Sequence, residues 1–147
     1  MMAVYNRMPE NPAMIDMFGR YLRILAEREG ASLVHCFAGK DRTGVAATML
    51  LHILGVGEED QTAEFLRTND APTLGVLARQ SLPGMEARLG RSLSENDVRD
   101  FLEVREEYLD TFRGIVSQSH GSFDDYLRNA IGVDDALRES LIERYVA

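Results

Sequence analysis

Only one segment of this 147-residue chain, Ala31–Phe37, has the pattern of a β-strand. Its centre, Leu33-Val34, is a short apolar run of the kind found in strands that are buried in a core. A lone strand cannot satisfy its backbone hydrogen-bonding groups there. The sequence therefore leaves three arrangements open: Met1–Arg7 supplies a weak second strand, another chain completes the sheet, or the sequence is the C-terminal part of a longer fold.

The rest of the chain has helical patterns. Asn11-Pro12 is a helix-start signal, with Asn as N-cap and Pro at the first helical position. Thr43–Leu54 is apolar on nearly every face, which indicates a buried helix. Ser94, which opens a capping-box pattern, and Ser122 are expected to cap later helices. The predicted helices span residues 12–28, 43–54, 58–68, 72–81, 95–119, 123–131 and 134–145, with turn signals at Asn69–Pro72 and Pro83-Gly84 among others.

The composition is that of a soluble globular protein, with 45% hydrophobic residues and no low-complexity run. A formal charge of −8 argues against a nucleic-acid-binding protein, because such affinity comes from dense Lys and Arg. The single cysteine, Cys36, excludes an intramolecular disulfide and any multi-cysteine metal site. No apolar run is long enough to span a bilayer, and no signal-peptide pattern opens the sequence. We therefore expect a cytoplasmic protein in which residues 1–147 form a single domain.

The most informative segment is the run His35-Cys36-Phe37-Ala38-Gly39-Lys40-Asp41-Arg42-Thr43-Gly44. It leads from the candidate strand through a loop to a helix start. Backbone N–H groups of a tight glycine-containing loop that ends on a helix N-terminus form a cradle suited to a phosphate dianion. The same partial positive charge, with an arginine nearby, can lower a cysteine pKa to roughly 3.5–7.5 from about 8.5. Cys36 is therefore predicted to be an activated thiolate nucleophile.

The neighbours of Cys36 have roles that fit this chemistry. Arg42 offers a planar fork of donors that can hold two phosphoryl oxygens at once and follow them into the transition state. The Thr43 hydroxyl can hydrogen-bond the thiolate and stabilise Cys36 as a leaving group. His35 is expected to orient the loop through hydrogen bonds, since a thiolate needs no base. Gly39 allows the backbone to approach the ligand closely.

This run resembles the His-Cys-x-x-Gly-x-x-Arg-[Ser/Thr]-Gly signature of the Cys-x5-Arg protein tyrosine and dual-specificity phosphatases. It is most similar to the bacterial branch typified by mycobacterial protein tyrosine phosphatase B. The resemblance continues through Phe65–Asp70, Val104–Leu109 and Gly121–Arg128. It implies the α/β phosphatase fold, in which a mixed sheet flanked by helices carries the loop. That fold would be represented here mainly by its helical C-terminal half, with one catalytic-loop strand.

The resemblance also implies a reaction. Members of this branch hydrolyse phosphoric monoesters through a cysteinyl-phosphate intermediate without metal or other cofactor. Their substrates are phosphotyrosine proteins, sometimes phosphoserine or phosphothreonine proteins, and phosphoinositides. Cys36 would be the nucleophile, Arg42 the phosphate clamp, and Lys40 next to Asp41 the variant associated with phosphoinositides. The phosphate-binding cradle would comprise Phe37, Ala38, Gly39, Lys40, Asp41 and Arg42.

Full-length members carry an N-terminal portion that nothing in this sequence matches, with most of the sheet and the Asp usually taken as general acid. The resemblance thus implies an N-terminally truncated catalytic domain, whose sheet a homo-oligomer or the missing N-terminal half would complete. Loss of a general acid typically removes a factor of about 10²–10⁴ in rate. Asp41 has two interpretations that remain open: it acts as an acid or orients water, or it braces the loop.

The alternative function is a catalytically impaired phosphate-binding or interaction module that captures a phosphorylated ligand without turning it over. A thiol redox role such as arsenate reduction shares the low cysteine pKa. That role typically requires resolving cysteines, and Cys36 stands alone.

Overall fold

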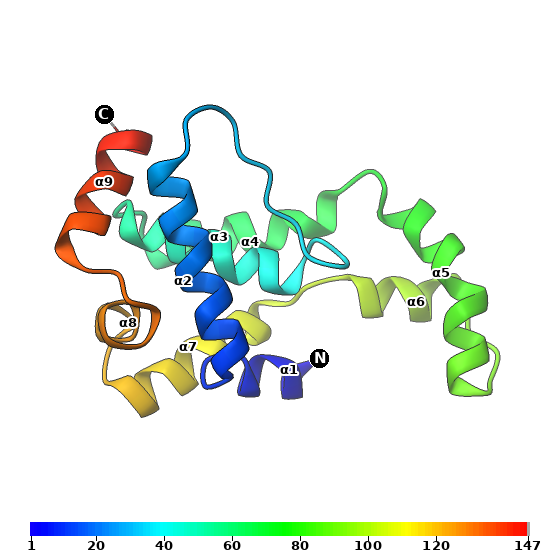
Figure 1. Cartoon of the computed structure of the whole chain (residues 1–147). Coiled ribbons are helices and arrows are strands. Elements are labelled where there is room, and N and C mark those ends of the chain that lie inside the picture. The colour runs from blue at the N-terminus through cyan, green and yellow to red at the C-terminus, as the bar shows by residue number, and fades with distance from the viewer. Residues whose placement is uncertain (147) are drawn as a thin grey trace.

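The chain folds into helices joined by loops (Figure 1). The structure is a computed structural model and describes residues 1–146, except for the side chain of Asp100. No helix within that range is both long enough and apolar enough to cross a membrane. The helices are α1 (Met2–Arg7), α2 (Pro12–Glu27), α3 (Asp41–Ile53), α4 (Glu58–Leu66), α5 (Leu74–Leu89), α6 (Glu95–Leu102), α7 (Glu106–His120), α8 (Phe123–Tyr126) and α9 (Asp135–Val146). A 3₁₀ turn, Arg67–Asp70, follows α4, and a π-helical turn, Leu127–Ile131, follows α8.

One large hydrophobic core holds α1–α4 and α7–α9 together. Helix α3 contacts α2, α4 and α9, and α7 contacts α1, α4 and α8. Every one of these helices buries at least one large side chain in the core, including Tyr5, Phe18, Met49, Phe65, Leu109, Tyr126 and Leu141. Each such burial stabilises the fold by about 1.5–3 kcal/mol relative to exposure. The core therefore fixes α3, whose first turn carries the Arg-Thr-Gly motif.

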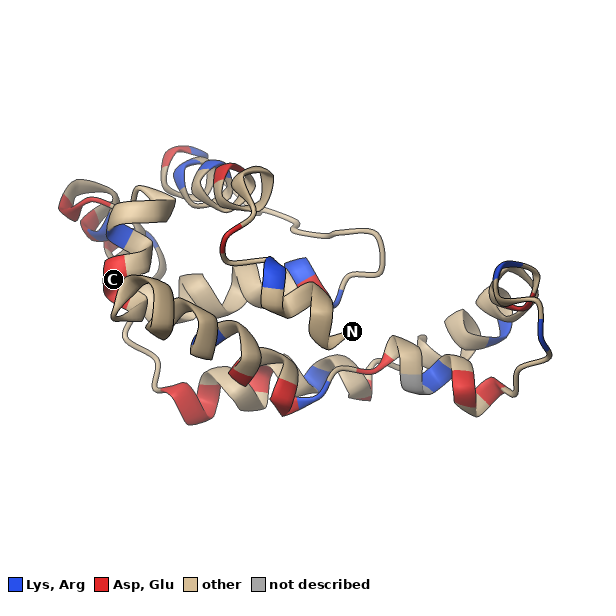
Figure 2. Ribbon diagram, turned by 90° about the horizontal axis from the view of Figure 1, so that it is seen from below, with Lys and Arg blue, Asp and Glu red and all other residues tan. Residues whose placement is uncertain are grey.

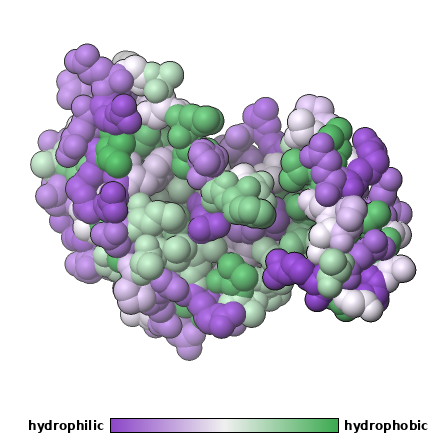
Figure 3. Space-filling view, turned by 45° about the vertical axis from the view of Figure 1, so that its right-hand side comes forward, coloured by the Kyte–Doolittle hydropathy of each residue, from purple (hydrophilic) through white to green (hydrophobic). Residues whose placement is uncertain are grey.

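Helices α5 and α6 form an arm beside this body. They pack on each other through a small separate cluster that includes Leu74, Ala78, Val98 and Leu102. The space-filling view shows the arm standing apart from the body, with a hollow between the two at the surface (Figure 3). The arm joins the body through two segments, residues 71–73 before α5 and residues 103–105 after α6.

The helix starts predicted at residues 12, 95 and 123 are confirmed. The Asn11 side chain accepts hydrogen bonds from the backbone N–H groups of Ala13 and Met14, and Pro12 is the first residue of α2. Ser94 forms a full capping box with Asp97 at the start of α6. Ser122 caps α8. Because these caps satisfy N–H groups that lack helical partners, local sequence is enough to locate the starts.

Two predicted helix boundaries are wrong. Helix α5 runs through Pro83-Gly84, where the sequence indicates a turn, because Leu82 and Met85 on either side pack against the arm cluster. The helix predicted over residues 95–119 is instead broken into α6 and α7. The break occurs because the Asn69 side chain hydrogen-bonds both the N–H and the C=O of Val104 and holds that residue extended.

The predicted strands are also wrong. Within residues 1–146 no β-strand occurs, and Met1–Arg7, the candidate second strand, is mostly the helix α1. Ala31–Phe37 is extended chain that arches from the end of α2 to the start of α3 (Figure 1). In the part of the chain that the structure describes, the backbone groups of residues 30–35 make no hydrogen bond. A strand needs a paired neighbour, so the segment with strand composition does not form one here.

Candidate active site

The His-Cys run forms the loop that leads into α3. Lys40 precedes the helix as its N-cap residue, and Asp41 is the first helical residue. Gly39 has φ +68°, a left-handed conformation that L side chains rarely adopt. The first α3 hydrogen bond that closes a full turn is donated by Gly44 to the Lys40 carbonyl. The N–H groups of Asp41, Arg42 and Thr43 thus lack helical acceptors, and those of Asp41 and Arg42 are available to an anion.

The Cys36 thiol lies where several donors converge. Its partial burial by itself raises the pKa, but hydrogen bonds outweigh that effect and lower the pKa to about 7. The strongest donor is the Thr43 hydroxyl, followed by the backbone N–H groups of Thr43, Gly39 and Ala38. Among the described residues the buried Thr43 Oγ1 donates to no oxygen or nitrogen acceptor, so its proton can turn toward the sulfur. The Cys36 thiol can therefore ionise near neutral pH.

Arg42 projects from the first turn of α3 and is half-buried. Among the described residues its guanidinium makes neither a hydrogen bond nor an ion pair, whereas several other arginines do. A guanidinium that no protein group engages can bind two oxygens of a phosphoryl group in a bidentate manner. The groups that change the pKa of Cys36 most do not include Arg42, so its role as phosphate clamp stays a prediction.

His35 and Phe37 lie on either side of the cysteine and are exposed. His35 Nδ1 is 3.2 Å from the carbonyl oxygen of Cys36, a contact confined to adjacent residues. The Phe37 side chain is 99% exposed and touches nothing that would hold it. Among the described residues, neither side chain forms a hydrogen bond to the helices of the body. Lys40 and Asp41, which follow Gly39, are held by hydrogen bonds.

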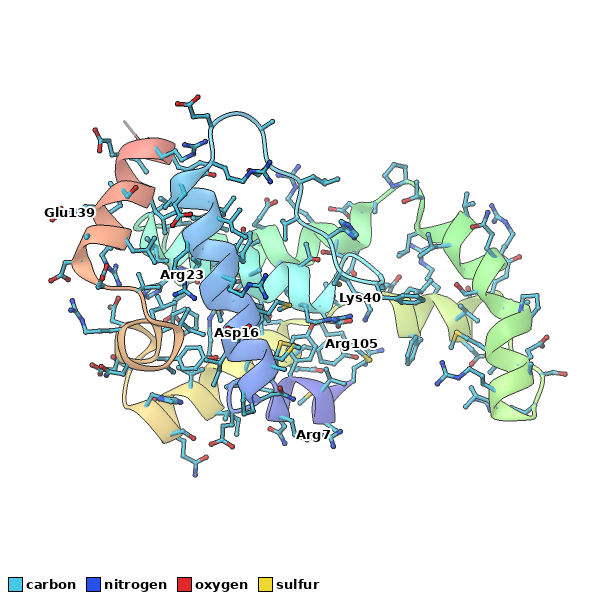
Figure 4. All side chains as sticks on the ribbon, in the orientation of Figure 1. Arg7, Asp16, Arg23, Lys40, Arg105 and Glu139 are labelled. Atoms are coloured by element: carbon cyan, nitrogen blue, oxygen red, sulfur yellow. The ribbon has the colours of Figure 1, made fainter. Side chains whose placement is uncertain are left out.

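Lys40 and Asp41 turn inward, and Lys40 is only 2% exposed. Lys40 Nζ donates to Asp41 Oδ1 at 3.2 Å and to the Glu103 carbonyl at 3.3 Å, and it lies 5.8 Å from the centroid of the Phe101 ring. Figure 4 shows Lys40 where the loop meets the segment that joins α6 to α7. The hydrogen bonds of the Lys40 ammonium thus go to other groups of the protein.

The carboxylate of Asp41 has a second donor that sequence reasoning missed. The Tyr5 hydroxyl, from α1, donates to Asp41 Oδ1 at 2.8 Å. Burial, together with the charge of Asp41, raises the pKa of Tyr5 far above its ordinary range, so Tyr5 remains a donor. The Tyr5 ring packs on Phe65 and Tyr108. No local pattern marks Tyr5 as a partner, because it lies 36 residues before Asp41.

Asn69 and Gly44 also support the loop. Asn69 Nδ2 donates to the Val104 carbonyl at 2.9 Å, and the Val104 N–H donates to Asn69 Oδ1 at 2.8 Å. These bonds hold the segment 103–105 in place. The Glu103 carbonyl of that segment accepts the hydrogen bond from Lys40 Nζ. A side chain at Gly44 would place its Cβ 2.6 Å from the Phe65 ring, so glycine here permits α3 to pack closely on α4. Asn69, which belongs to the turn predicted at Asn69–Pro72, therefore also helps to support the loop that carries Cys36.

Among the side chains that the structure describes, no cluster of three or more His, Cys, Asp or Glu is placed to hold a metal ion. The groups that converge on Cys36 are hydroxyl and amide donors, which suit an oxyanion. The site thus combines a partly ionised thiol, free helix-start amides and an unengaged guanidinium.

A model of the tyrosine phosphatase family matches residues 1–147. The chain belongs to the tyrosine phosphatase family. A protein of Cupriavidus necator that carries the name of a tyrosine phosphatase is 36% identical over 121 residues, which cover 82% of this chain and 42% of that protein. The triple specificity protein phosphatase PtpB of Mycobacterium tuberculosis is 32% identical over 120 residues, covering 71% of this chain and 40% of PtpB. This tyrosine phosphatase family chain thus spans well under half the length of either relative.

Proposed function

We propose that this protein is a metal-independent, cysteine-based phosphoric monoester hydrolase that acts on phosphorylated proteins. The observation that carries the proposal is the Cys36 thiol, whose pKa of about 7 results from donors placed where a phosphoryl group would bind. Membership of the tyrosine phosphatase family supports the same reaction class. The free thiol also fits a reducing compartment, and we propose a cytoplasmic location.

In the first step the Cys36 thiolate attacks phosphorus. A sulfur–phosphorus bond forms as the bond from phosphorus to the leaving oxygen breaks, and that oxygen takes a proton from water or an acid. Arg42 and the free amides of α3 stabilise the equatorial oxygens in the transition state. Water then attacks phosphorus, inorganic phosphate leaves, and the Thr43 hydroxyl stabilises the departing thiolate.

Asp41 acts as a brace in this proposal. Its Oδ1 accepts hydrogen bonds from both Tyr5 and Lys40, so this oxygen is not free to carry a proton to a leaving group. Aryl phosphates, whose leaving groups need little protonation, are therefore the best substrates of this chain. Phosphotyrosine is the aryl phosphate found in proteins, and the printed name of the mycobacterial relative, a protein phosphatase, supports protein substrates.

Phosphoinositides remain a second substrate class. Their additional phosphates would meet the Lys40 ammonium only if it left Asp41 and the Glu103 carbonyl. Phosphotyrosine needs no such rearrangement. Comparing Lys40→Ala with the unchanged protein on both substrates tests the point, because equal relative activities would exclude a specific role for Lys40 in phosphoinositide recognition.

The test of the proposed reaction is hydrolysis of para-nitrophenyl phosphate in the presence of EDTA, beside Cys36→Ser. We expect turnover that vanadate inhibits and that Cys36→Ser abolishes. Equal turnover by both proteins would contradict the proposal, because the activity would then not depend on the thiolate. Circular dichroism of both samples controls for folding.

The alternative is a phosphate-binding module without turnover. The chain spans 42% and 40% of its two relatives, so a group that these proteins use to protonate the leaving oxygen can lie outside the matched region. This alternative predicts that vanadate or tungstate protects Cys36 from alkylation while para-nitrophenyl phosphate is not hydrolysed. Turnover lost in Cys36→Ser would exclude it.

A further inference from the structure

We propose that Tyr5 is a positioning residue of the active site: its buried hydroxyl holds the Asp41 carboxylate away from the free amides at the start of α3, which therefore stay open to phosphate. The inference rests on the proposed function, because phosphate is the ligand proposed for these amides. It assigns a role to a residue that lies 36 positions before Asp41 and outside the signature loop.

The start of α3 offers its free amides to any anion nearby. The N–H groups of Asp41 and Arg42 have no helical acceptor, and Lys40, the N-cap residue, makes no side-chain cap bond. Aspartate side chains readily accept hydrogen bonds from their own or neighbouring backbone N–H groups, and the helix dipole attracts a carboxylate in the first turn. A carboxylate of Asp41 that was not held elsewhere would therefore compete with phosphate for these amides.

The structure directs the Asp41 carboxylate to other donors. Its Oδ1 accepts a hydrogen bond from the Tyr5 hydroxyl at 2.8 Å and another from Lys40 Nζ at 3.2 Å. Figure 2 shows charges of both signs gathered where the loop enters α3, beside α1, the helix that carries Tyr5. Of the two donors, the hydroxyl is the closer one and comes from outside the loop, so it ties the carboxylate to the body of the protein.

The position of the Tyr5 hydroxyl is set by the packing of its ring. The ring is fully buried, lies edge-on to Phe65 with centroids 6.3 Å apart, and stacks on Tyr108 at 5.3 Å. Phe65 in turn occupies the space that Gly44 leaves open on α3. Lys40, by contrast, carries its ammonium at the end of a flexible four-carbon stem. Tyr5 is therefore the stiffer of the two donors to Asp41.

The Tyr5 hydroxyl stays protonated while the thiolate is present. Burial, followed by the charge of Asp41, raises the pKa of Tyr5 far above its ordinary range, and the charge of Cys36 acts in the same direction. An effect of the Cys36 charge requires the hydroxyl to lie near the thiol. Tyr5 thus supplies a neutral donor close to the nucleophile and adds no further negative charge where a phosphate dianion would bind.

The experiment compares Tyr5→Phe with the unchanged protein by the protection that tungstate gives Cys36, the only cysteine, against iodoacetamide. Tungstate is an oxyanion, and the concentration that halves the alkylation rate measures its affinity without any turnover. We expect that concentration to rise about tenfold in Tyr5→Phe, the size of one hydrogen bond to a charged group. An unchanged concentration overturns the inference.

Hydrolysis of para-nitrophenyl phosphate gives a second measurement. Competition from the Asp41 carboxylate weakens binding and not the chemical step, so KM of Tyr5→Phe should rise about tenfold while kcat stays within about twofold. A fall in kcat with KM unchanged would contradict the inference.

Tyr126→Phe is the matched control. The Tyr126 hydroxyl is also fully buried, but it donates to the carbonyl oxygen of Pro9 at 3.1 Å. We expect both variants to lower the free energy of unfolding in urea, and only Tyr5→Phe to weaken tungstate binding. Equal weakening by both variants would contradict the inference, because the loss of any buried hydroxyl would then loosen the site.

Removal of the carboxylate distinguishes positioning from a merely structural role. If Tyr5 acts through Asp41, the double variant Tyr5→Phe, Asp41→Ala should bind tungstate within about twofold of Asp41→Ala alone. A double variant that binds about tenfold more weakly than Asp41→Ala contradicts the inference, because the hydroxyl would then act independently of the carboxylate. Asp41→Asn, which keeps an acceptor for Lys40, serves the same comparison if Asp41→Ala does not fold.

The positioning role and the proposed reaction can fail separately. Tungstate protection without hydrolysis would contradict the reaction, and the protection assay would still decide the role of Tyr5. Hydrolysis and protection that Tyr5→Phe leaves unchanged would contradict the role of Tyr5 and not the reaction.

Discussion

Replacing Thr43 by alanine is expected to raise the pKa of Cys36. In the folded chain that pKa is lowered to about 7, and the Thr43 hydroxyl is the strongest of the donors that lower it. A hydrogen bond to a charged group contributes about 1.5–3 kcal/mol. We take the lower end because the thiol is only partly buried. At 1.36 kcal/mol per tenfold change, the titration midpoint should move up by about one pH unit.

The sequence offers a direct assay. Cys36 is the only cysteine, so the rate of alkylation by iodoacetamide reports on this thiol alone. Plotted against pH, the rate follows the thiolate fraction, which at pH 7 should fall from about one half to about one tenth. We therefore expect alkylation of Thr43→Ala to be about fivefold slower at pH 7 and equal to that of the unchanged protein above pH 10.

Thr43→Ser is the matched control, because it keeps the hydroxyl and the backbone N–H. Its midpoint should stay near that of the unchanged protein. The reasoning is refuted if Thr43→Ala titrates at the same pH as Thr43→Ser, because the hydroxyl would then make no difference to the thiolate. Circular dichroism confirms that both variants are folded.

Three further changes test other parts of the structure. Because the pKa of Cys36 is about 7 in the folded chain against 9.0 for a free thiol, the free energy of unfolding should rise from pH 7 to pH 9, and urea titrations of Cys36→Ser should lack that rise. Asn69→Ala removes two hydrogen bonds to Val104 and should lower the free energy of unfolding by about 1–3 kcal/mol, measured by urea denaturation. Gly44→Ala places a Cβ against the Phe65 ring and should cost about 1–3 kcal/mol in the same assay; a cost below 0.5 would contradict close packing there.

Local patterns predicted several features correctly. The starts of α2, α6 and α8 are recognisable because the capping side chain and the N–H groups that it binds lie within three residues of each other. Short separation along the chain also explains why Ala38, Gly39 and Thr43 act on the sulfur of Cys36, since a short loop and one helical turn bring them together; the role of Arg42 stays a prediction.

Features that depend on distant contacts were not predictable. The break between α6 and α7 is made by Asn69, which lies 35 residues before Val104. The continuation of α5 through Pro83 depends on packing between α5 and α6. Strand composition in Ala31–Phe37 did not produce a strand, because pairing requires a neighbour that residues 1–146 do not provide. In each case the deciding interaction has no counterpart in nearby sequence.

The sequence by itself determined the family of this chain and the motif that marks it: one thiol, a glycine-containing loop, an arginine and a helix start in a fixed order. Only the tertiary structure decided which way the side chains of that loop turn. Lys40, which sequence alone would assign to substrate, is buried against Asp41 and Glu103, and Asp41 is held by Tyr5 from α1. The reason is physical. Loop spacing fixes which backbone groups can reach a phosphate, whereas the direction of a long side chain depends on the partners that the rest of the fold brings to it.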